Sequence, residues 1–370
     1  MLSMKPRLHI LFEHGLHDLT PFSSSQIRLI RPFSHPDLQS TFNTTFGAEY
    51  FGQSVEAVIV DRLWRPRINL AMAKSLRNDI QRNKAKLIYA LDDDFLNLNP
   101  DELDFQLTHE MLDSVQYFLT NADGVIVTTD ALKEQFSEYN SKIMVVPNML
   151  DERLFASPAG EFIPKEKIVI GYMGTYTHDA DLKMIMPALR EIMKSYSGRI
   201  EIQVLGISLK EETLRALNGL PARVISLDPL SRSYDKFVPW FHANLHWDIG
   251  LCPLLDSPFN RCKSDIKHLD YGAAGIPGIY SRVPVYESTV QHLRTGYLAE
   301  NTPESWVEGL KRLIDDVDLR CEIAVHARDY VISQRTVKAS AANLIRAINT
   351  ILERKDPSVE KRPEGLPLSV

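Results

Sequence analysis

Cysteine is scarce in this sequence, which has three cysteines among 370 residues. Cys252, Cys262 and Cys321 show no paired spacing of the kind that metal sites use, and an odd number cannot form a complete set of disulfides. These features argue against a zinc module and against a disulfide-stabilised secreted fold. A reducing, cytoplasmic setting is therefore favoured.

Long apolar runs are also missing. No window offers about 18 apolar residues, the length needed to cross a bilayer, so we expect no transmembrane helix. The opening segment MLSMKPRLHILFEH has only about five consecutive apolar-leaning positions, too few for the core of a secretion signal. Any contact with a membrane is then expected to be peripheral.

A strong charge of either sign is absent as well, since the net charge is −6 and 24% of the residues are charged. This balance predicts no nucleic-acid binding by the chain as a whole. The exception is segment 62–86, where eight basic residues accompany one acid, Asp79. A solvated helix face is one interpretation, and attraction to anionic lipid head groups is the other. The basic residues are Arg62, Arg65, Arg67, Lys74, Arg77, Arg82, Lys84 and Lys86.

What is present is a long alternation of apolar and amphipathic segments, which is typical of parallel α/β sheets. The chain is long for one hydrophobic core, so two domains are expected. In the first half, the predicted strands are Leu8–Phe12, Ala57–Val60, Leu87–Leu91, Gly124–Thr128 and Ile143–Val146. The predicted helices are Ile68–Asn83, Thr108–Leu119 and Ala131–Tyr139.

The alternation starts again after residues 147–166, where prolines and a glycine interrupt any periodicity. The predicted strands there are Ile168–Tyr172, Glu201–Leu205, Val224–Leu227 and Ile249–Cys252. The predicted helices are Leu182–Tyr196, Lys210–Asn218 and Tyr234–Ala243, followed by helix from Pro303 to about Glu353. We therefore predict domains at 1–150 and 151–354, each Rossmann-like, and a disordered tail at 355–370. The ligand site is expected in the cleft between the two lobes.

The stretch from Asp248 to Tyr280 combines an apolar strand, a polar cationic loop and a short helix. Helical spacing places Lys263, Lys267 and Asp270 on one face. Cations beside a helix N-terminus suit phosphate, because the unpaired N–H groups and the helix dipole attract the same charge. The stretch therefore predicts a phosphate-binding strand, loop and helix.

Four segments resemble the GT-B glycosyltransferases, most closely the large retaining family 4, whose members transfer sugars from nucleotide donors. The segments are VVPNMLDERLF (145–155), IVIGYMGTYTHDADL (168–182), IEIQVLG (200–206) and the stretch 248–280. The resemblance implies an α/β protein of GT-B fold, in which two Rossmann-like domains face each other across a cleft. It also implies that residues 1–150 hold the acceptor and residues 151–354 hold the nucleotide sugar.

The resemblance also assigns donor-site residues. The family signature carries two glutamates eight positions apart before a Gly-x-Pro turn, and Gly275 and Pro277 set that register here. The second acid then falls on Asp270, the expected ribose ligand, and the first falls on Cys262, which lacks a carboxylate. Asp270 and Lys263 are the expected catalytic residues. Donor contacts are expected from Gly174, Thr175, His178, Arg261, Lys263, Lys267 and Asp270.

Acceptor-side residues are expected after two strands of the first half. His14 and Gly15 follow the first strand, and Asp93 and Asp94 follow strand Leu87–Leu91. Clustered carboxylates after a strand bind metal in transferases of another fold. A GT-B enzyme holds its donor through the second lobe without a metal, so the resemblance implies neither a metal nor a cofactor beyond the donor itself.

These features predict a glycosyltransferase that moves a sugar from a nucleotide-diphosphate donor to a glycan or lipid-linked acceptor, with retention of configuration. The resemblance further implies a role in surface-polysaccharide assembly. The cysteine content favours a cytoplasmic location, and the charge of segment 62–86 favours a peripheral position on the membrane. A sugar-nucleotide epimerase of GT-B fold is one alternative. A catalytically inactive nucleotide-sugar-binding partner is another, because Cys262 replaces a family carboxylate.

Overall fold

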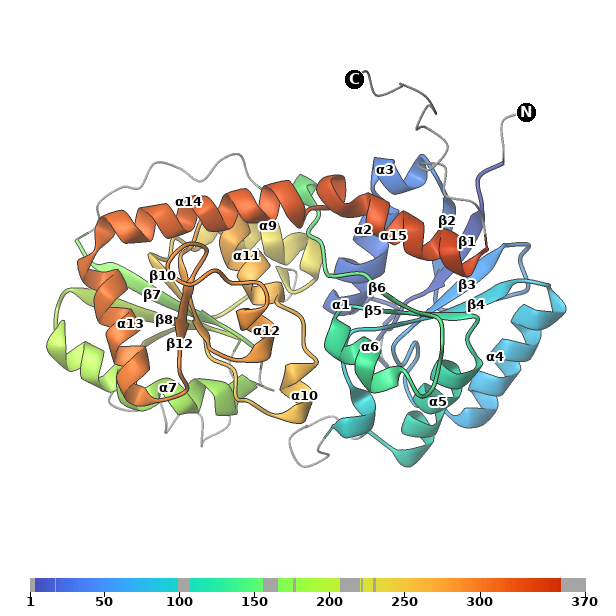
Figure 1. The fold of residues 1–370 in the computed structure, drawn as a ribbon, viewed down its shortest axis with the longest axis horizontal. Coiled ribbons are helices and arrows are strands. Elements are labelled where there is room, and N and C mark those ends of the chain that lie inside the picture. The colour runs from blue at the N-terminus through green and yellow to red at the C-terminus, as the bar shows by residue number, and fades with distance from the viewer. Residues whose placement is uncertain are drawn as a thin grey trace, which may run out of the picture.

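The structure is a computed structural model that describes residues 4–16, 18–98, 107–155, 166–175, 178–206, 220, 222–228 and 231–353. Within these residues, two six-stranded sheets follow one another along the chain and helices cover their faces (Figure 1). The strand pairs of both sheets are parallel. The predicted helix Lys210–Asn218 and the predicted tail 355–370 lie outside the described residues.

The first sheet has the strand order β2-β1-β3-β4-β5-β6. Its strands are β1 (Arg7–Leu11), β2 (Asn43–Gly47), β3 (Ala57–Asp61), β4 (Lys86–Leu91), β5 (Gly124–Val127) and β6 (Ile143–Val145). Its helices are α1 (Ser23–Ser25), the π-helical η1 (Gln26–Ile30), α2 (Arg31–Phe33), α3 (Pro36–Gln39), α4 (Leu70–Arg82), η2 (Phe95–Asn97), α5 (His109–Asn121) and α6 (Asp130–Phe136). Polar N-caps start the longer ones, since Asn69, Thr108 and Thr129 accept from N–H groups of α4, α5 and α6.

Side chains alternate between the two faces of this sheet, so each face has its own core. Val58, Val60 and Tyr89 pack with residues of α4, α5 and α6 on one face. Ile59 and Ile88 pack with α2, α3 and the last helix of the chain on the other.

The second sheet has the strand order β12-β11-β10-β7-β8-β9. Its strands are β7 (Ile168–Met173), β8 (Ile200–Leu205), β9 (Ala222–Ile225), β10 (Ile249–Cys252), β11 (Gly278–Ser281) and β12 (Tyr297–Ala299). The helices after the first sheet are η4 (Glu152–Leu154), α7 (Asp179–Ser195), α9 (Tyr234–Asn244), α10 (Pro258–Arg261), α11 (Ile266–Ala274), α12 (Pro284–Glu287), α13 (Pro303–Asp315), α14 (Val317–Gln334) and α15 (Val337–Ile351). Gly275 ends α11 with a φ of 68°, a left-handed conformation that suits glycine.

The last two helices join the halves of the molecule. α14 lies along the second half, and α15 continues over the first sheet (Figure 1), where Val337, Leu344 and Ile348 are buried in its core. The domain limits stay a prediction. The predicted limits assign α15 to the second domain, but its apolar face packs against the first sheet. Between α14 and α15, Arg335 bonds both carboxylate oxygens of Asp265 at 2.7 and 2.8 Å.

The predicted strands and helices within the described residues are confirmed, with ends displaced by a few residues. Three strands were missed. β2 is a half-exposed edge strand without apolar alternation. β11 starts directly after Pro277 and was interpreted as part of a turn, and β12 has only three residues.

Candidate functional site

Two glycines shape the turn at the carboxyl end of β7. Gly174 donates its N–H to the Leu205 carbonyl at 3.0 Å, and a Cβ on Gly174 would lie 2.6 Å from the Tyr172 hydroxyl. Gly206 has a φ of 74°, and a side chain there would collide with the Gly174 carbonyl oxygen. The backbone from β7 into Thr175 is therefore held close to the end of β8, as a phosphate-binding turn requires.

His178 starts α7 beside this turn, and its Nδ1 lies 2.7 Å from Asp181 Oδ2. The other Asp181 oxygen accepts from the Leu255 N–H at 2.7 Å, so Asp181 ties α7 to the loop after β10. Burial lowers the pKa of His178 to about 4, and the ammonium groups of Lys267 and Lys263 act in the same direction. His178 is thus a neutral imidazole close to two cations.

Helix α11 places Lys267 near the same turn, and Asp270 lies close to Lys267 and to Cys252 at the end of β10. Lys267 Nζ lies 5.5 Å from the centre of the Tyr172 ring on β7. Burial raises the pKa of Asp270 to about 7, against the opposing influence of Lys267. Five residues predicted to bind the donor therefore meet at the carboxyl ends of the second sheet. They are Gly174, Thr175, His178, Lys267 and Asp270.

Arg261 is engaged elsewhere. Its Nε and Nη2 atoms bond both carboxylate oxygens of Asp256 at 2.7 and 2.8 Å, and its side chain is 57% exposed. The planar fork expected to hold a diphosphate thus already holds a carboxylate. Binding the donor through Arg261 would require this pair to open.

The loop between α10 and α11 lies against the first half of the protein. Cys262 is buried in the core of the first sheet, and its carbonyl oxygen accepts from the Thr129 hydroxyl at 3.1 Å. Asn148 donates to the Ser264 hydroxyl at 2.8 Å. Burial raises the pKa of Cys262 to about 11, and Asp94 and Asp93 raise it further. The thiol at the position of the family's first glutamate is therefore neutral and faces a core.

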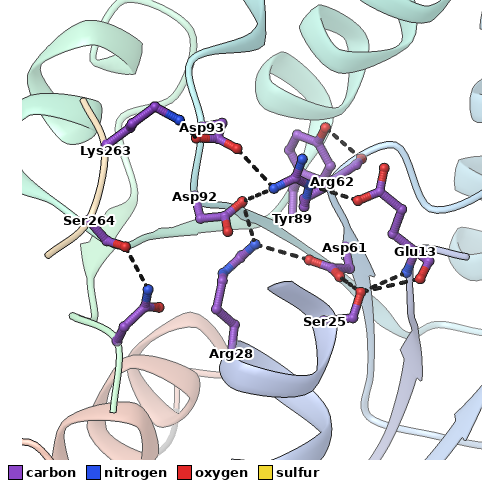
Figure 2. A network of polar contacts seen from close by, with 11 residues as sticks. Glu13, Ser25, Arg28, Asp61, Arg62, Tyr89, Asp92, Asp93, Lys263 and Ser264 are labelled. Carbon is purple, nitrogen blue, oxygen red and sulfur yellow. Dashed lines mark hydrogen bonds and ion pairs between the residues drawn. The ribbon is translucent and has the colours of Figure 1, made fainter. Parts of the chain in front are cut away.

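Lys263 crosses between the two halves. Its Nζ lies 3.9 Å from Asp93 Oδ1 (Figure 2). The same Nζ lies 4.5 Å from the centre of the Phe259 ring. A residue expected to bind the donor thus contacts one expected on the acceptor side. The contact joins the two predicted sites.

Arg62 forms the centre of a polar network on the first half (Figure 2). Its Nε lies 2.7 Å from Glu13 Oε2, and its Nη1 lies 2.7 Å from Asp92 Oδ1 and 3.0 Å from Asp93 Oδ2. Arg62 has a φ of 46°, and its carbonyl oxygen accepts from the Tyr89 hydroxyl at 2.9 Å. One guanidinium therefore holds three carboxylates that come from two loops, one after β1 and one after β4.

A second arginine extends the network inward. Arg28 of η1 lies 3.1 Å from both Asp61 and Asp92, and the Ser25 hydroxyl donates to Asp61 at 2.5 Å. Burial raises the pKa of Asp61, and Arg28 opposes this rise. Sequence reasoning missed Glu13, Asp61 and Arg28. The position of the two acids could have identified them, because Glu13 follows β1 and Asp61 ends β3. Neighbouring parallel strands bring their carboxyl ends together, so acids at these ends are expected to lie close to each other.

A cavity of about 670 Å³ lies beside Glu13 and is lined by His14 and Gly15. Asp93 and Asp94 are not among its lining residues. Asp94 instead accepts from the Asn97 side chain at 2.8 Å, and burial raises the pKa of Asp94. The residues predicted for the acceptor side are thus separated: His14 and Gly15 line the cavity, Asp93 belongs to the Arg62 network, and Asp94 bonds Asn97.

Among the described residues, one group brings three possible metal ligands together: His35, Asp151 and Glu152. Asp151 already contacts Arg31 at 2.5 Å and Arg153 at 2.8 Å, so its charge is balanced by arginine. The Asp92–Asp94 series does not form such a group; Asp92 and Asp93 face Arg62.

Most cations of segment 62–86 have acidic partners. Arg62 lies inside the network, and the other pairs are Arg65–Glu49, Arg77–Asp123, Arg82–Asp79 and Lys86–Asp123. The positive charge that suggested a membrane-facing surface is therefore largely compensated. No helix in the described part of the chain is both long and apolar enough to span a bilayer.

No protein-family model matches the sequence, and no curated protein matches it significantly. Solved structures do match. HepE of Anabaena, solved with UDP and glucose, has a TM-score of 0.65 at 12% identity, and the match covers 93% of this chain and 100% of that one. A glycosyltransferase of Rickettsia africae has a TM-score of 0.65 at 11% identity, covering 95% and 100%. Sucrose-phosphate synthase of Thermosynechococcus elongatus has a TM-score of 0.60 at 14% identity, covering 81% and 74%.

These similarities, together with the two parallel six-stranded sheets, confirm the predicted fold class. The chain has the GT-B fold.

Proposed function

We propose that this protein is a glycosyltransferase that moves a sugar from a nucleotide-diphosphate donor to a glycan or lipid-linked acceptor. The observation that carries the proposal is the position of His178 and Lys267 beside the Gly174 turn, with Asp270 close to Lys267 on the same helix. HepE, which has the same fold, was solved with UDP and glucose, and GtfA, a pneumococcal O-GlcNAc transferase, with UDP and GlcNAc. A nucleotide-sugar donor for this chain follows from that similarity by analogy.

The donor would bind with its ribose on Asp270 and its diphosphate near Gly174 and the lysines. Lys267 is close enough to lower the pKa of His178 and to oppose the rise in the pKa of Asp270. Lys263 and Lys267 would stabilise the negative charge that develops on the departing diphosphate, which is the main requirement of the transfer step. This role needs no metal ion, because the two ammonium groups supply the positive charge.

The finer parts of the proposal rest on the sequence resemblance. These are membership of family 4, retention of anomeric configuration and a role in surface-polysaccharide assembly. A cytoplasmic location with peripheral membrane contact belongs with them. Among the described residues, the ion pairs of segment 62–86 leave Arg67, Lys74 and Lys84 as its cations for such a contact.

Donor binding is tested by the thermal stability of the full chain with UDP-, GDP- and dTDP-sugars. A ligand that binds the native state raises the melting temperature by mass action. We expect one nucleotide class to raise it, and Lys267→Ala and Asp270→Ala each to remove most of that shift. Lys311→Ala is the control, because Lys311 pairs with Glu191 on the surface at 3.2 Å. Equal shifts in all variants would contradict the site, and the lack of a shift with every nucleotide sugar would contradict the function.

A further inference from the structure

The cavity beside Glu13 is formed at the carboxyl end of the first sheet. Its walls come from the loop after β1, the loop after β3 and the start of α5. A volume of about 670 Å³ is in the range of small-molecule sites. Its lining contains both polar and apolar side chains, and we call the part at Glu13 the polar end and the part at Leu16 and Phe22 the apolar end.

The polar end is the Glu13 carboxyl group, which is 4% exposed. Arg62 connects it to Asp93, and Asp93 contacts Lys263 across the two halves (Figure 2). This end of the cavity is therefore linked by three ionic contacts to a candidate donor lysine. Burial raises the pKa of Glu13 to about 7, against the opposing influence of Arg62, so the group can donate or accept hydrogen bonds near neutral pH. Both abilities suit a sugar hydroxyl.

The apolar end is formed by side chains that a folded chain usually buries. Leu16 and Phe22 line the cavity although they are 60% and 42% exposed, and Leu63, Ile68 and Met111 are further apolar lining residues. The lining also includes the polar side chains of Arg65, Arg67 and Glu110. Exposed apolar side chains that gather around a cavity indicate an apolar ligand. The apolar end therefore favours a hydrocarbon group rather than a second sugar.

The wall from the loop after β3 is held in a costly conformation. Arg62, Trp64 and Arg67 have φ values of 46°, 54° and 55°, which non-glycine residues rarely adopt. The Trp64 indole N–H donates to the Ala48 carbonyl at 2.8 Å and helps to keep the loop in place. Strained backbone persists where the surroundings impose it, and such places are often ligand sites.

We propose that this cavity binds the acceptor as an amphiphile, with a hydroxyl-bearing sugar at Glu13 and an apolar aglycone along Leu16 and Phe22. The proposal rests on the proposed function and narrows its acceptor to a glycolipid-like class. The sugar end then lies on the side of Lys263 and the donor. The aglycone leaves past the exposed side chains of the β1 loop.

The test measures binding of alkyl glucosides and galactosides by calorimetry, with methyl, hexyl and octyl chains kept below their critical micelle concentrations. Each buried methylene is expected to strengthen binding about threefold to fourfold. Leu16→Asn should flatten this dependence on chain length. Leu19→Asn is the matched control, because Leu19 is 64% exposed in the same loop and does not line the cavity. Glu13→Gln should weaken every glycoside by a similar factor.

Two outcomes would overturn the proposal. The first is equal affinity for methyl and octyl glycosides. The second is an equal loss in the Leu16 and Leu19 variants, which would indicate nonspecific partition of the alkyl chain. Donor binding is measured separately by thermal shift. If the protein binds a nucleotide sugar but its affinity for alkyl glycosides does not depend on chain length, the proposed function stands and the amphiphilic acceptor is contradicted.

Discussion

Lys263 and Asp93 come from loops in different halves of the molecule, and the Lys263 ammonium lies 3.9 Å from an Asp93 carboxylate oxygen. The same Asp93 also contacts Arg62, which contacts Glu13. The charge expected to bind the donor is thus partly balanced by a carboxylate of the other half. A diphosphate would compete with Asp93 for Lys263.

This competition predicts opposite effects for the two partners. Lys263→Ala should weaken binding of the nucleotide diphosphate by about tenfold or more, since a charged hydrogen bond contributes about 1.5–3 kcal/mol. Asp93→Asn should strengthen it by up to about fivefold, because a partly exposed ion pair contributes at most about 1 kcal/mol. Calorimetric titration of UDP, GDP and dTDP measures both. A loss of affinity in Asp93→Asn would contradict the competition.

Glu13 predicts a pH dependence of stability. Burial raises the pKa of Glu13 from 4.5 to about 7, so the folded state prefers the protonated group. The stability from this preference is complete below pH 4.5 and is lost as the pH rises through about 7. Glu13→Gln mimics the protonated group. The variant should match the parent near pH 4 and exceed it near pH 8 by roughly 3 kcal/mol in unfolding free energy.

Denaturant unfolding of parent and variant across this pH range measures the difference. Glu138→Gln is the control, because Glu138 is exposed on the first half. A constant difference between parent and Glu13→Gln at all pH values would show that Glu13 titrates normally in the folded protein.

The three cysteines should differ in reactivity. Burial raises the pKa of Cys252 and of Cys262 to about 11, whereas Cys321 is half-buried. Since the thiolate is the reactive form, iodoacetamide should label Cys321 at least about tenfold faster than the other two. Mass spectrometry of peptides over a time course reports the three rates. In denaturant the rates should converge, and fast native labelling of Cys262 would contradict its burial against the first sheet.

The Arg335–Asp265 pair should be a strong structural contact. Both side chains are almost buried, at 11% and 5% exposure, and the pair joins α11 to the segment between α14 and α15. Asp265→Asn leaves a buried guanidinium without its charge partner and should cost about 3 kcal/mol in unfolding free energy. Arg82→Ala is the control, since the Arg82–Asp79 pair is exposed and should matter by less than about 1 kcal/mol. An equal loss of unfolding free energy in Asp265→Asn and Arg82→Ala would contradict a strong stabilising contribution of the buried pair.

The sequence by itself was enough for the order of most strands and helices, because hydrophobic periodicity is a local property. Val58 and Val60 alternate with Ile59, and this pattern already predicts a buried strand with two covered faces. Helical spacing likewise predicted one face for Lys263, Lys267 and Asp270, and Lys267 and Asp270 do lie on α11. Lys263 was assigned wrongly, because it lies in the loop before that helix. β2 was missed because it is a half-exposed edge strand and has no alternation of apolar residues.

Only the tertiary structure decided which charged groups meet. Strand order places β1, β3 and β4 side by side, so Glu13, Arg62 and Asp92 come together from loops far apart in the sequence. The crossing of α15 onto the first sheet and the burial of Cys262 in that core also depend on contacts between distant segments. Local spacing carries no information about such contacts, because they follow from how the two sheets and their loops pack.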